Sequence, residues 1–246
     1  MLDANVPVFS FIFGIPPADV LRECRRRNIV TIGTATTPEE AVALQEAGVD
    51  VIAASGFEAG GHRGSFLRAA EDSLTGTFSL VPRIVSRVDV PVLGAGGVGD
   101  ARGVVAALAL GAEGVQMGTV FLTCQESGAS RLHREALGAR DSGRTALTRA
   151  FTGRLARAIE NRLLREFNEQ APKILPYPLQ RGLVRELSIV AEAAGRPDLL
   201  PLWAGQSAGL SACTEAAAFL QSLVDDVSTI AGPVSDWSAK YRRRAL

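Results

Sequence analysis

The sequence has no excess of either charge and few aromatic residues, and each shortage argues against a class of protein. Its 26 Lys and Arg residues balance 26 Asp and Glu residues, so the formal net charge is zero. Without a basic excess there is no field to hold a phosphate backbone, which argues against a dedicated nucleic-acid binder. Aromatic residues make up 6%, too few for a stacking platform for single strands.

Long apolar runs, signal peptides and metal-binding motifs are also missing. Glycine or a charged residue interrupts every apolar run well before the ~20 residues that a membrane span needs. The start, MLDANVPVF, lacks a basic n-region, so no signal peptide is visible. No HxxE or HExxH spacing supports a metal site. These absences favour a cytoplasmic protein that contacts neither membrane nor nucleic acid.

Cysteine is sparse, with three residues far apart at Cys24, Cys124 and Cys213. A small odd count in a chain of this size predicts free thiols in a reducing compartment. The spacing fits neither a disulfide framework nor a zinc site.

Five short apolar runs in the first half predict strands buried on both faces of a parallel sheet. They are Val6–Phe13, Ile29–Gly33, Val49–Ala54, Val90–Ala95 and Gly114–Met117. Helical patterns lie between them at Pro17–Arg27, Thr37–Gly48 and Asp100–Gly111. Thr37 suits an N-cap, Pro38 the first turn and Glu40 a capping box. The alternation predicts βα units with right-handed crossovers.

After Leu122 the pattern predicts helices and no strand. The expected helices are Glu126–Ala139, Arg154–Gln170, Leu179–Ala194 and Cys213–Val227. The tail from Gly232 to Leu246 is expected to fray.

A glycine-rich loop follows the third predicted strand and reads SGFEAGGHRG from Ser55 to Gly64. Its glycines allow the backbone to approach a ligand closely and leave amide groups free for an anion. His62 is the one side chain there that exchanges a proton near neutral pH. The alternative is a flexible glycine loop with a solvated histidine. His133 lies in a polar helical pattern and is interpreted as a surface residue.

Two further glycine turns end the fourth and fifth predicted strands. Gly94–Asp100 reads GAGGVGD before a helix, and Gln116–Thr119 reads QMGT. A glycine turn at a helix N-terminus is an anion site, and two on adjacent strands favour a phosphate cradle. The spacing does not match the GxGxxG dinucleotide fingerprint. The alternative is that these glycines only make tight turns. Trp203 and Gln206 either line a pocket or anchor a loop.

Taken together in this order, the motifs resemble those of the FMN-dependent nitronate monooxygenases, formerly called 2-nitropropane dioxygenases. The resemblance rests on FEAGGHRG, PVLGAGGVGDARGVVAALALGAEGVQMGTVFL, TRAFTGRLARAIENRL, PYPLQ and LWAGQSAGL, and upstream on VPVFSFIFGIP. It extends to about Leu223. The flavin-dependent enoyl-acyl-carrier-protein reductase shares the EAGGH segment and is the nearest related family, but RAFTGRLAR and WAGQ favour the monooxygenases.

The resemblance implies an α/β fold, a (β/α)₈ TIM barrel followed by a helical domain. We expect a partial barrel here, about the last five βα units with the first three missing, and a C-terminal helical subdomain. The expected regions are an FMN-binding partial barrel at 1–123, a helical substrate or lid subdomain at 124–195, a closing segment at 196–230 and a tail at 231–246. Open sheet edges would favour instability or a homo-oligomer, with weak FMN binding.

The resemblance also implies a cofactor, a base and a reaction. FMN would contact Ser55, Gly60, Gly61, Gly96, Gly97, Gln116, Met117, Gly118 and Thr119. His62 would bind the substrate and act as the base toward neutral nitroalkanes. O₂ would oxidise an alkyl nitronate to a carbonyl compound and nitrite. The family usually has Gln where this chain has Ser55, and a shorter Ser would reach the flavin only through water.

Three alternatives remain open at this point. The first is an FMN-dependent NAD(P)H reductase of a quinone or an enoyl thioester. The second is an inactive family fragment or scaffold, and the third is a phosphate-binding sheet edge unrelated to flavin.

Overall fold

The structure is a computed structural model that describes residues 6–169, 173–210 and 213–242. Its centre is a five-stranded parallel sheet in the order β1-β2-β3-β5-β6, so strands adjacent along the chain lie side by side. The strands are β1 (Val8–Phe11), β2 (Val30–Ala35), β3 (Val51–Ser55), β5 (Val92–Ala95) and β6 (Gly114–Gln116). All five strands that the apolar runs predict are confirmed, with slightly different ends.

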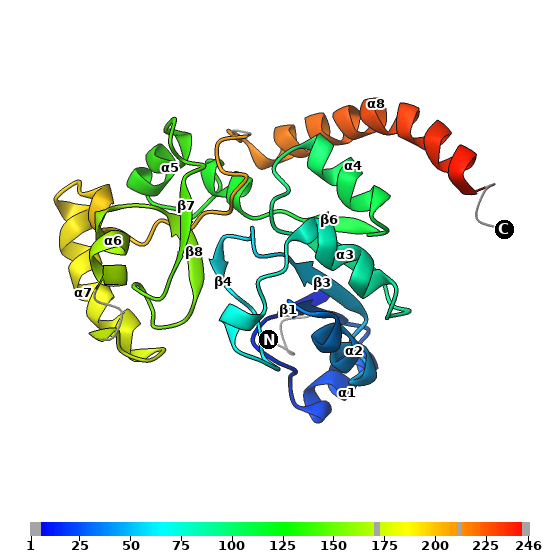
Figure 1. The fold of residues 1–246 in the computed structure, drawn as a ribbon, viewed down its shortest axis with the longest axis horizontal. Helices are drawn as coiled ribbons and strands as arrows, with labels where there is room; N and C mark the ends of the chain where they lie inside the picture. The colour runs from blue at the N-terminus through cyan, green and yellow to red at the C-terminus, as the bar shows by residue number, and fades with distance from the viewer. Residues whose placement is uncertain (1–5, 170–172, 211–212, 243–246) are drawn as a thin grey trace.

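Four helices pack on one face of this sheet (Figure 1). They are α1 (Ala18–Arg26), α2 (Pro38–Glu46), α3 (Thr77–Val85) and α4 (Ala101–Ala109). A sequential strand order with right-handed crossovers places every connecting helix on the same side. In β3, Ile52 and Ala54 are buried among Leu80 and Ile84 of α3. The opposite side of β3 is therefore left for Ala53 and Ser55, which face the cavity described below.

Two of the helix starts follow the predicted caps. The Thr37 hydroxyl accepts a hydrogen bond from the amide of Glu40 at 3.2 Å, and the Asp100 carboxylate accepts one from the amide of Gly103 at 3.1 Å. The capping box is only half formed, because the Glu40 side chain does not return to the Thr37 amide and takes other partners instead.

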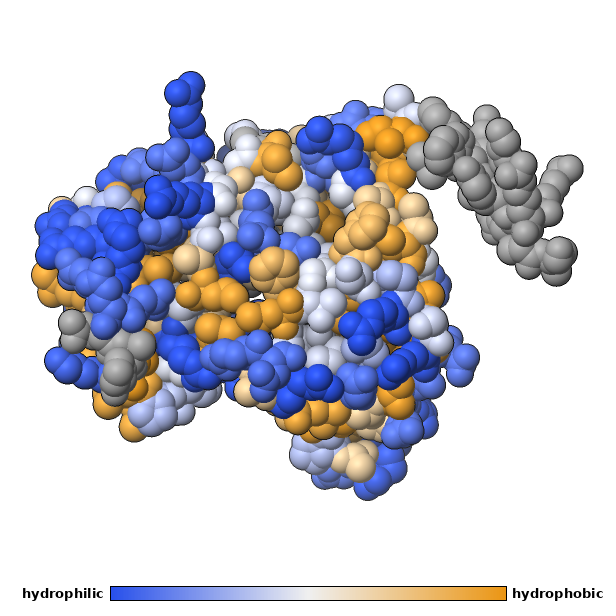
Figure 2. Space-filling model, in the orientation of Figure 1, coloured by the Kyte–Doolittle hydropathy of each residue, from blue (hydrophilic) through white to orange (hydrophobic). Residues whose placement is uncertain are grey.

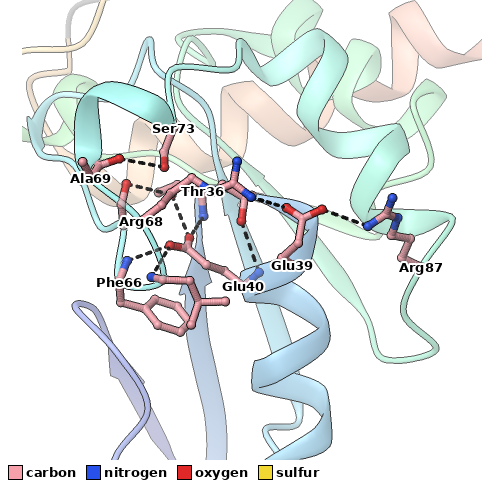
Figure 3. A network of polar contacts seen from close by, with 11 residues as sticks. Thr36, Glu39, Glu40, Phe66, Arg68, Ala69, Ser73 and Arg87 are labelled. Carbon is pink, nitrogen blue, oxygen red and sulfur yellow. Dashed lines mark hydrogen bonds and ion pairs between the residues drawn. The ribbon is translucent and has the colours of Figure 1, made fainter.

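The Glu40 carboxylate is fully buried and ties α2 to the segment after the glycine loop (Figure 3). One oxygen accepts from the Thr36 amide and hydroxyl, each at 2.7 Å. The other accepts from the amides of Phe66 at 2.6 Å and Leu67 at 3.2 Å. The Thr36 hydroxyl also lies 2.9 Å from that of Ser65. One carboxylate thus satisfies three backbone amides that would otherwise be orphaned.

A second sheet contradicts the expectation that the later half has no strand. Its order is β4-β8-β7, antiparallel throughout, with β4 (Gly61–His62), β7 (Thr145–Thr148) and β8 (Ala156–Ile159). The predicted helix Arg154–Gln170 is wrong in its first part, since α6 begins only at Arg162. The residues ARAI of β8 favour helix locally, but their pairing with β4 and β7 overrides that preference.

The other helices of the later half surround this second sheet or extend from it. They are α5 (Arg131–Gly138), α6 (Arg162–Glu169), α7 (Leu179–Ala193) and α8 (Ala216–Arg242). The α5, α6 and α7 helices flank β7 and β8, whereas α8 runs along α4 and away from the body (Figure 1). The expected frayed tail is wrong as far as Arg242, because α8 continues to that residue; residues 243–246 lie outside the described part. On the face shown in Figure 2, hydrophobic surface gathers between the two halves of the molecule.

The prediction of three free thiols is wrong for two of them. Cys124 and Cys213 form a disulfide across 89 residues of sequence, and both are buried beside Val120. The Thr123 hydroxyl bonds both the carbonyl and the amide of Cys213, which brings the two segments together. The local sequence around either cysteine does not predict this long-range contact. Cys24 is free, as expected, and is buried.

We predict that Glu40→Gln lowers the free energy of unfolding by about 2–3 kcal/mol, because the NH₂ group of Gln is a donor and would face groups that donate to the Glu40 carboxylate. Glu39→Gln is the matched control. Glu39 is exposed and pairs with Arg68 and Arg87 at 3.1 and 3.0 Å, so its loss should cost less than about 1 kcal/mol. Urea unfolding of both variants measures this, and equal losses would contradict the assignment.

Candidate active site

A cavity of about 370 Å³ opens where the strands of the parallel sheet end. Ser55 ends β3, Ala95 ends β5 and Gln116 ends β6, and all three line it. Residues 203–205 and 207 close the opposite side. Since parallel strands have their carboxyl ends at one edge, three turns far apart in sequence share a single space. The volume lies within the ~300–1,000 Å³ typical of cofactor and ligand sites.

The structure brings together nine of the ten residues that the sequence analysis assigned to catalysis or to FMN. The residues that line the cavity are Ser55, Gly60, Gly61, His62, Gly96, Gly97, Gln116, Gly118 and Thr119. Met117 does not line it and packs instead against the cluster of Val120, Cys124 and Cys213. Of the two residues considered as pocket or anchor, Trp203 lines the cavity and Gln206 does not.

The glycine turns after β5 and β6 form a cradle of backbone amides. Gly96 and Gly97 have φ of +94° and +75°, a conformation that L side chains rarely adopt. Among the described residues, the amides of Gly97 and Gly118 have no hydrogen-bond partner. A Cβ added at Gly118 would meet no atom within 4 Å. No Lys or Arg lines the cavity, so an anion held there would be stabilised by amide dipoles and the start of α4.

The glycine loop is joined to the closing segment by direct backbone contact. The amide of Gln206 donates to the carbonyl of Glu58 at 2.9 Å, and the amide of Gly205 donates to the Thr119 hydroxyl at 2.9 Å. A Cβ on Gly60 would lie 2.5 Å from the Gly205 nitrogen, closer than real Cβ atoms approach. Glycine is therefore required at Gly60 for the approach itself.

Two buried arginines fix the shape of this loop, and sequence reasoning missed both. Arg63 is fully buried and donates to the carbonyls of Gly56, Ser55 (2.9 Å) and Ser73 (3.2 Å). Burial lowers the pKa of its guanidinium to about 10, so it remains charged at neutral pH. Arg157 donates to the Phe57 carbonyl at 2.9 Å and lies over the Phe57 ring. The available signal was an arginine inside an apolar strand and another directly after His62.

His62 lies at the end of β4, and the pairing of β4 with β8 sets its backbone position. Its Nε2 lies 2.8 Å from the buried Thr152 hydroxyl, which fixes the orientation of the ring. The rings of Phe13, Tyr177 and Trp203 surround it, with centroids at 5.8, 5.9 and 5.2 Å. Burial lowers the pKa of His62, and the nearby charges of Arg154 and Arg181 lower it further. The imidazole is therefore neutral at pH 7 and able to accept a proton.

The interpretation of His133 as a surface residue is wrong, because the ring is half-buried. Its Nε2 lies 2.9 Å from the Trp203 carbonyl. A carbonyl only accepts, so Nε2 carries a hydrogen. The contact arises because α5 packs against the closing segment, which its polar local sequence does not reveal.

The described residues contain no group of three or more His, Cys, Asp or Glu side chains placed to hold a metal ion. Nor is any helix in that part of the chain long and apolar enough to cross a membrane.

Comparison with known proteins gives the family. The family model described as nitronate monooxygenase matches residues 1–226. The chain belongs to the nitronate monooxygenase family. A probable nitronate monooxygenase from Staphylococcus aureus (strain Newman) is 43% identical over 231 residues, which are 94% of this chain and 65% of the relative. The chain thus spans 65% of the length of the curated relatives that it matches.

Two solved structures are similar to almost the whole chain. The nitroalkane oxidase from Streptomyces ansochromogenes superposes with a TM-score of 0.89 at 40% identity, covering 95% of this chain and 67% of that one. FabK from Thermotoga maritima superposes with a TM-score of 0.80 at 28% identity, covering 96% and 72%. The resemblance that the motifs indicate is therefore confirmed at the level of the family.

We predict that Gly60→Ala separates the glycine loop from the closing segment and lowers the free energy of unfolding by about 1–3 kcal/mol, because its Cβ overlaps the Gly205 backbone. Gly128→Ala is the control, since its Cβ would meet nothing within 4 Å. Chemical unfolding compares the two. A Gly60→Ala protein as stable as the Gly128→Ala protein would show that the close contact is not required.

Proposed function

We propose that the protein is an FMN-dependent oxidase of alkyl nitronates, which O₂ converts to a carbonyl compound and nitrite. The observation that carries this proposal is the meeting of His62 with the two glycine turns in one cavity. Membership of the nitronate monooxygenase family and the likeness to a nitroalkane oxidase support it. We also infer that the parallel sheet is an arc of a (β/α)₈ barrel, since its strand order is sequential and its helices share one face.

The residues of the cavity fit FMN. Its phosphate would be held by the unpartnered amides of Gly97 and Gly118, with Thr119 and Gln116 beside them. Its planar ring would lie against Gly60 and Gly61, where a Cβ on Gly61 would meet no atom within 4 Å. Ser55 lines the same wall. When bound, FMN supplies the electron transfer between the nitronate and O₂ that no side chain performs.

His62 would bind the nitronate and remove a proton from a neutral nitroalkane. The ring is neutral at pH 7, its orientation is fixed by Thr152, and the Trp203 ring packs beside it.

A second candidate is an FMN-dependent reductase that takes electrons from NAD(P)H, and the likeness to FabK favours it. The two proposals differ in their electron donor. Nitronate-dependent nitrite formation without NAD(P)H supports the first, whereas NAD(P)H consumption without nitrite supports the second.

We predict that Gly118→Val lowers the affinity of the chain for FMN at least about tenfold, because the side chain fills the cradle beside a required amide. Gly128→Val is the control, since both glycines have open space around them. Flavin absorbance of the protein peak measures retention. Equal retention by the two variants would place the phosphate elsewhere.

We predict that His62→Ala lowers kcat/KM for a neutral nitroalkane about 10²–10⁴-fold, the usual contribution of a general base. The kcat/KM of this variant for a preformed nitronate should fall less, because that substrate needs no deprotonation. His133→Ala is the control, as the only other histidine. Because burial lowers the pKa of His62, the rate with the neutral substrate should fall only below about pH 6.5 as the ring becomes protonated. Nitrite release measures both, and unchanged rates in His62→Ala would exclude this role.

A further inference from the structure

A second cavity of about 300 Å³ lies behind His62, between α5 and α7. It shares Trp203 with the first cavity and reaches Thr152, the residue bonded to His62. Nothing in the proposed flavin chemistry uses this space. Its inner wall is apolar, because Phe151, Val184 and Leu202 are all at most 3% exposed and line it together with Leu200.

The opposite side of this cavity carries two unpaired cations. Arg181 and Arg185 are four residues apart on α7, so both guanidinium groups lie on one face of the helix. Among the described residues, neither side chain makes a hydrogen bond or an ion pair. Some other surface arginines are paired, as Arg162 is with Glu166 and Arg196 with Asp198. The two guanidiniums beside an apolar wall are thus available for a ligand.

Polar groups at the rim define the chemistry further. Glu192 is the one acidic residue that lines the cavity, and it accepts a hydrogen bond from Ser130 at 3.2 Å. The lining therefore carries two positive charges against one negative charge. His133 presents an uncharged ring, because burial lowers its pKa. This balance suits a single negative charge at the arginine side of the cavity.

We propose that the second cavity binds a small amphipathic carboxylate, with its aliphatic chain against Phe151, Leu200 and Leu202 and its carboxylate at Arg181 and Arg185. Two guanidiniums recognise a carboxylate through charge-assisted hydrogen bonds. The apolar wall recognises the chain by burial. The site is separate from the flavin cavity, so the proposal stands independently of the reaction proposed above.

Trp203 makes occupancy measurable, because it forms the wall between the two cavities. The chain has only two tryptophans, and the other is Trp237. In the full chain carrying Trp237→Phe, fluorescence reports on Trp203 alone. The probe is sodium octanoate, compared with 1-octanol, which lacks the charge, and with acetate, which lacks the chain.

We expect octanoate to change Trp203 fluorescence saturably, and both comparison compounds to bind at least about tenfold more weakly. Arg181→Gln with Arg185→Gln should weaken octanoate binding by about tenfold or more. The matched control removes two other exposed arginines with no side-chain partner among the described residues, as Arg22→Gln with Arg83→Gln, and should leave binding unchanged. Thermal melting verifies that both double variants fold.

Three results would overturn the proposal. The first is no saturable response to octanoate. The second is equal octanoate binding by the two double variants, or binding of 1-octanol as tight as that of octanoate. Either result would mean that the cavity is an apolar space that does not recognise an anion. The third is release of bound FMN by octanoate in proportion to its binding, which would place the probe in the first cavity.

Discussion

The close backbone contact between the glycine loop and the closing segment is the constraint on which the candidate site depends. At Gly60 and Gly205 the backbones of the two segments lie so close together that neither position has room for a side chain. The hydrogen bond from Gln206 to Glu58 and that from Gly205 to Thr119 lie in the same contact. One end of the contact belongs to the parallel sheet and the other to the later half of the chain. Without it, the strand ends would form an open groove rather than a cavity.

Much of the sheet could be predicted from sequence because its information is local. Val51–Ser55 is an apolar run, and Thr37 and Asp100 cap the helices that they precede. Nine of the ten residues assigned to the site line the cavity, and that assignment rested on the resemblance to the family together with the glycine turns at the strand ends. Met117 does not line the cavity, because a sequence motif does not reveal which way each side chain of a tight turn points.

What sequence could not give depends on contacts between distant segments. The β8 strand reads as helix until its partners β4 and β7 are known, and the Cys124–Cys213 disulfide joins residues 89 apart. Arg63 and Arg157 were not predicted as site residues, because the carbonyls that surround a buried arginine are known only from the structure. The sequence motif placed Glu40 in a capping box, but its carboxylate binds Thr36 and the amides of a segment that begins 26 residues later.

The absence of Lys and Arg from the glycine cradle has a consequence for how an anion is held there. Attraction to a surface cation is weakened by dissolved salt over about one Debye length. Amide dipoles act at hydrogen-bond range inside a cavity, where few mobile ions enter. An anion bound in this cradle would thus be selected by the directions of its acceptor atoms more than by its charge. Such a cradle would distinguish a tetrahedral phosphate by shape, and the ionic strength of the surroundings would have little influence on that choice.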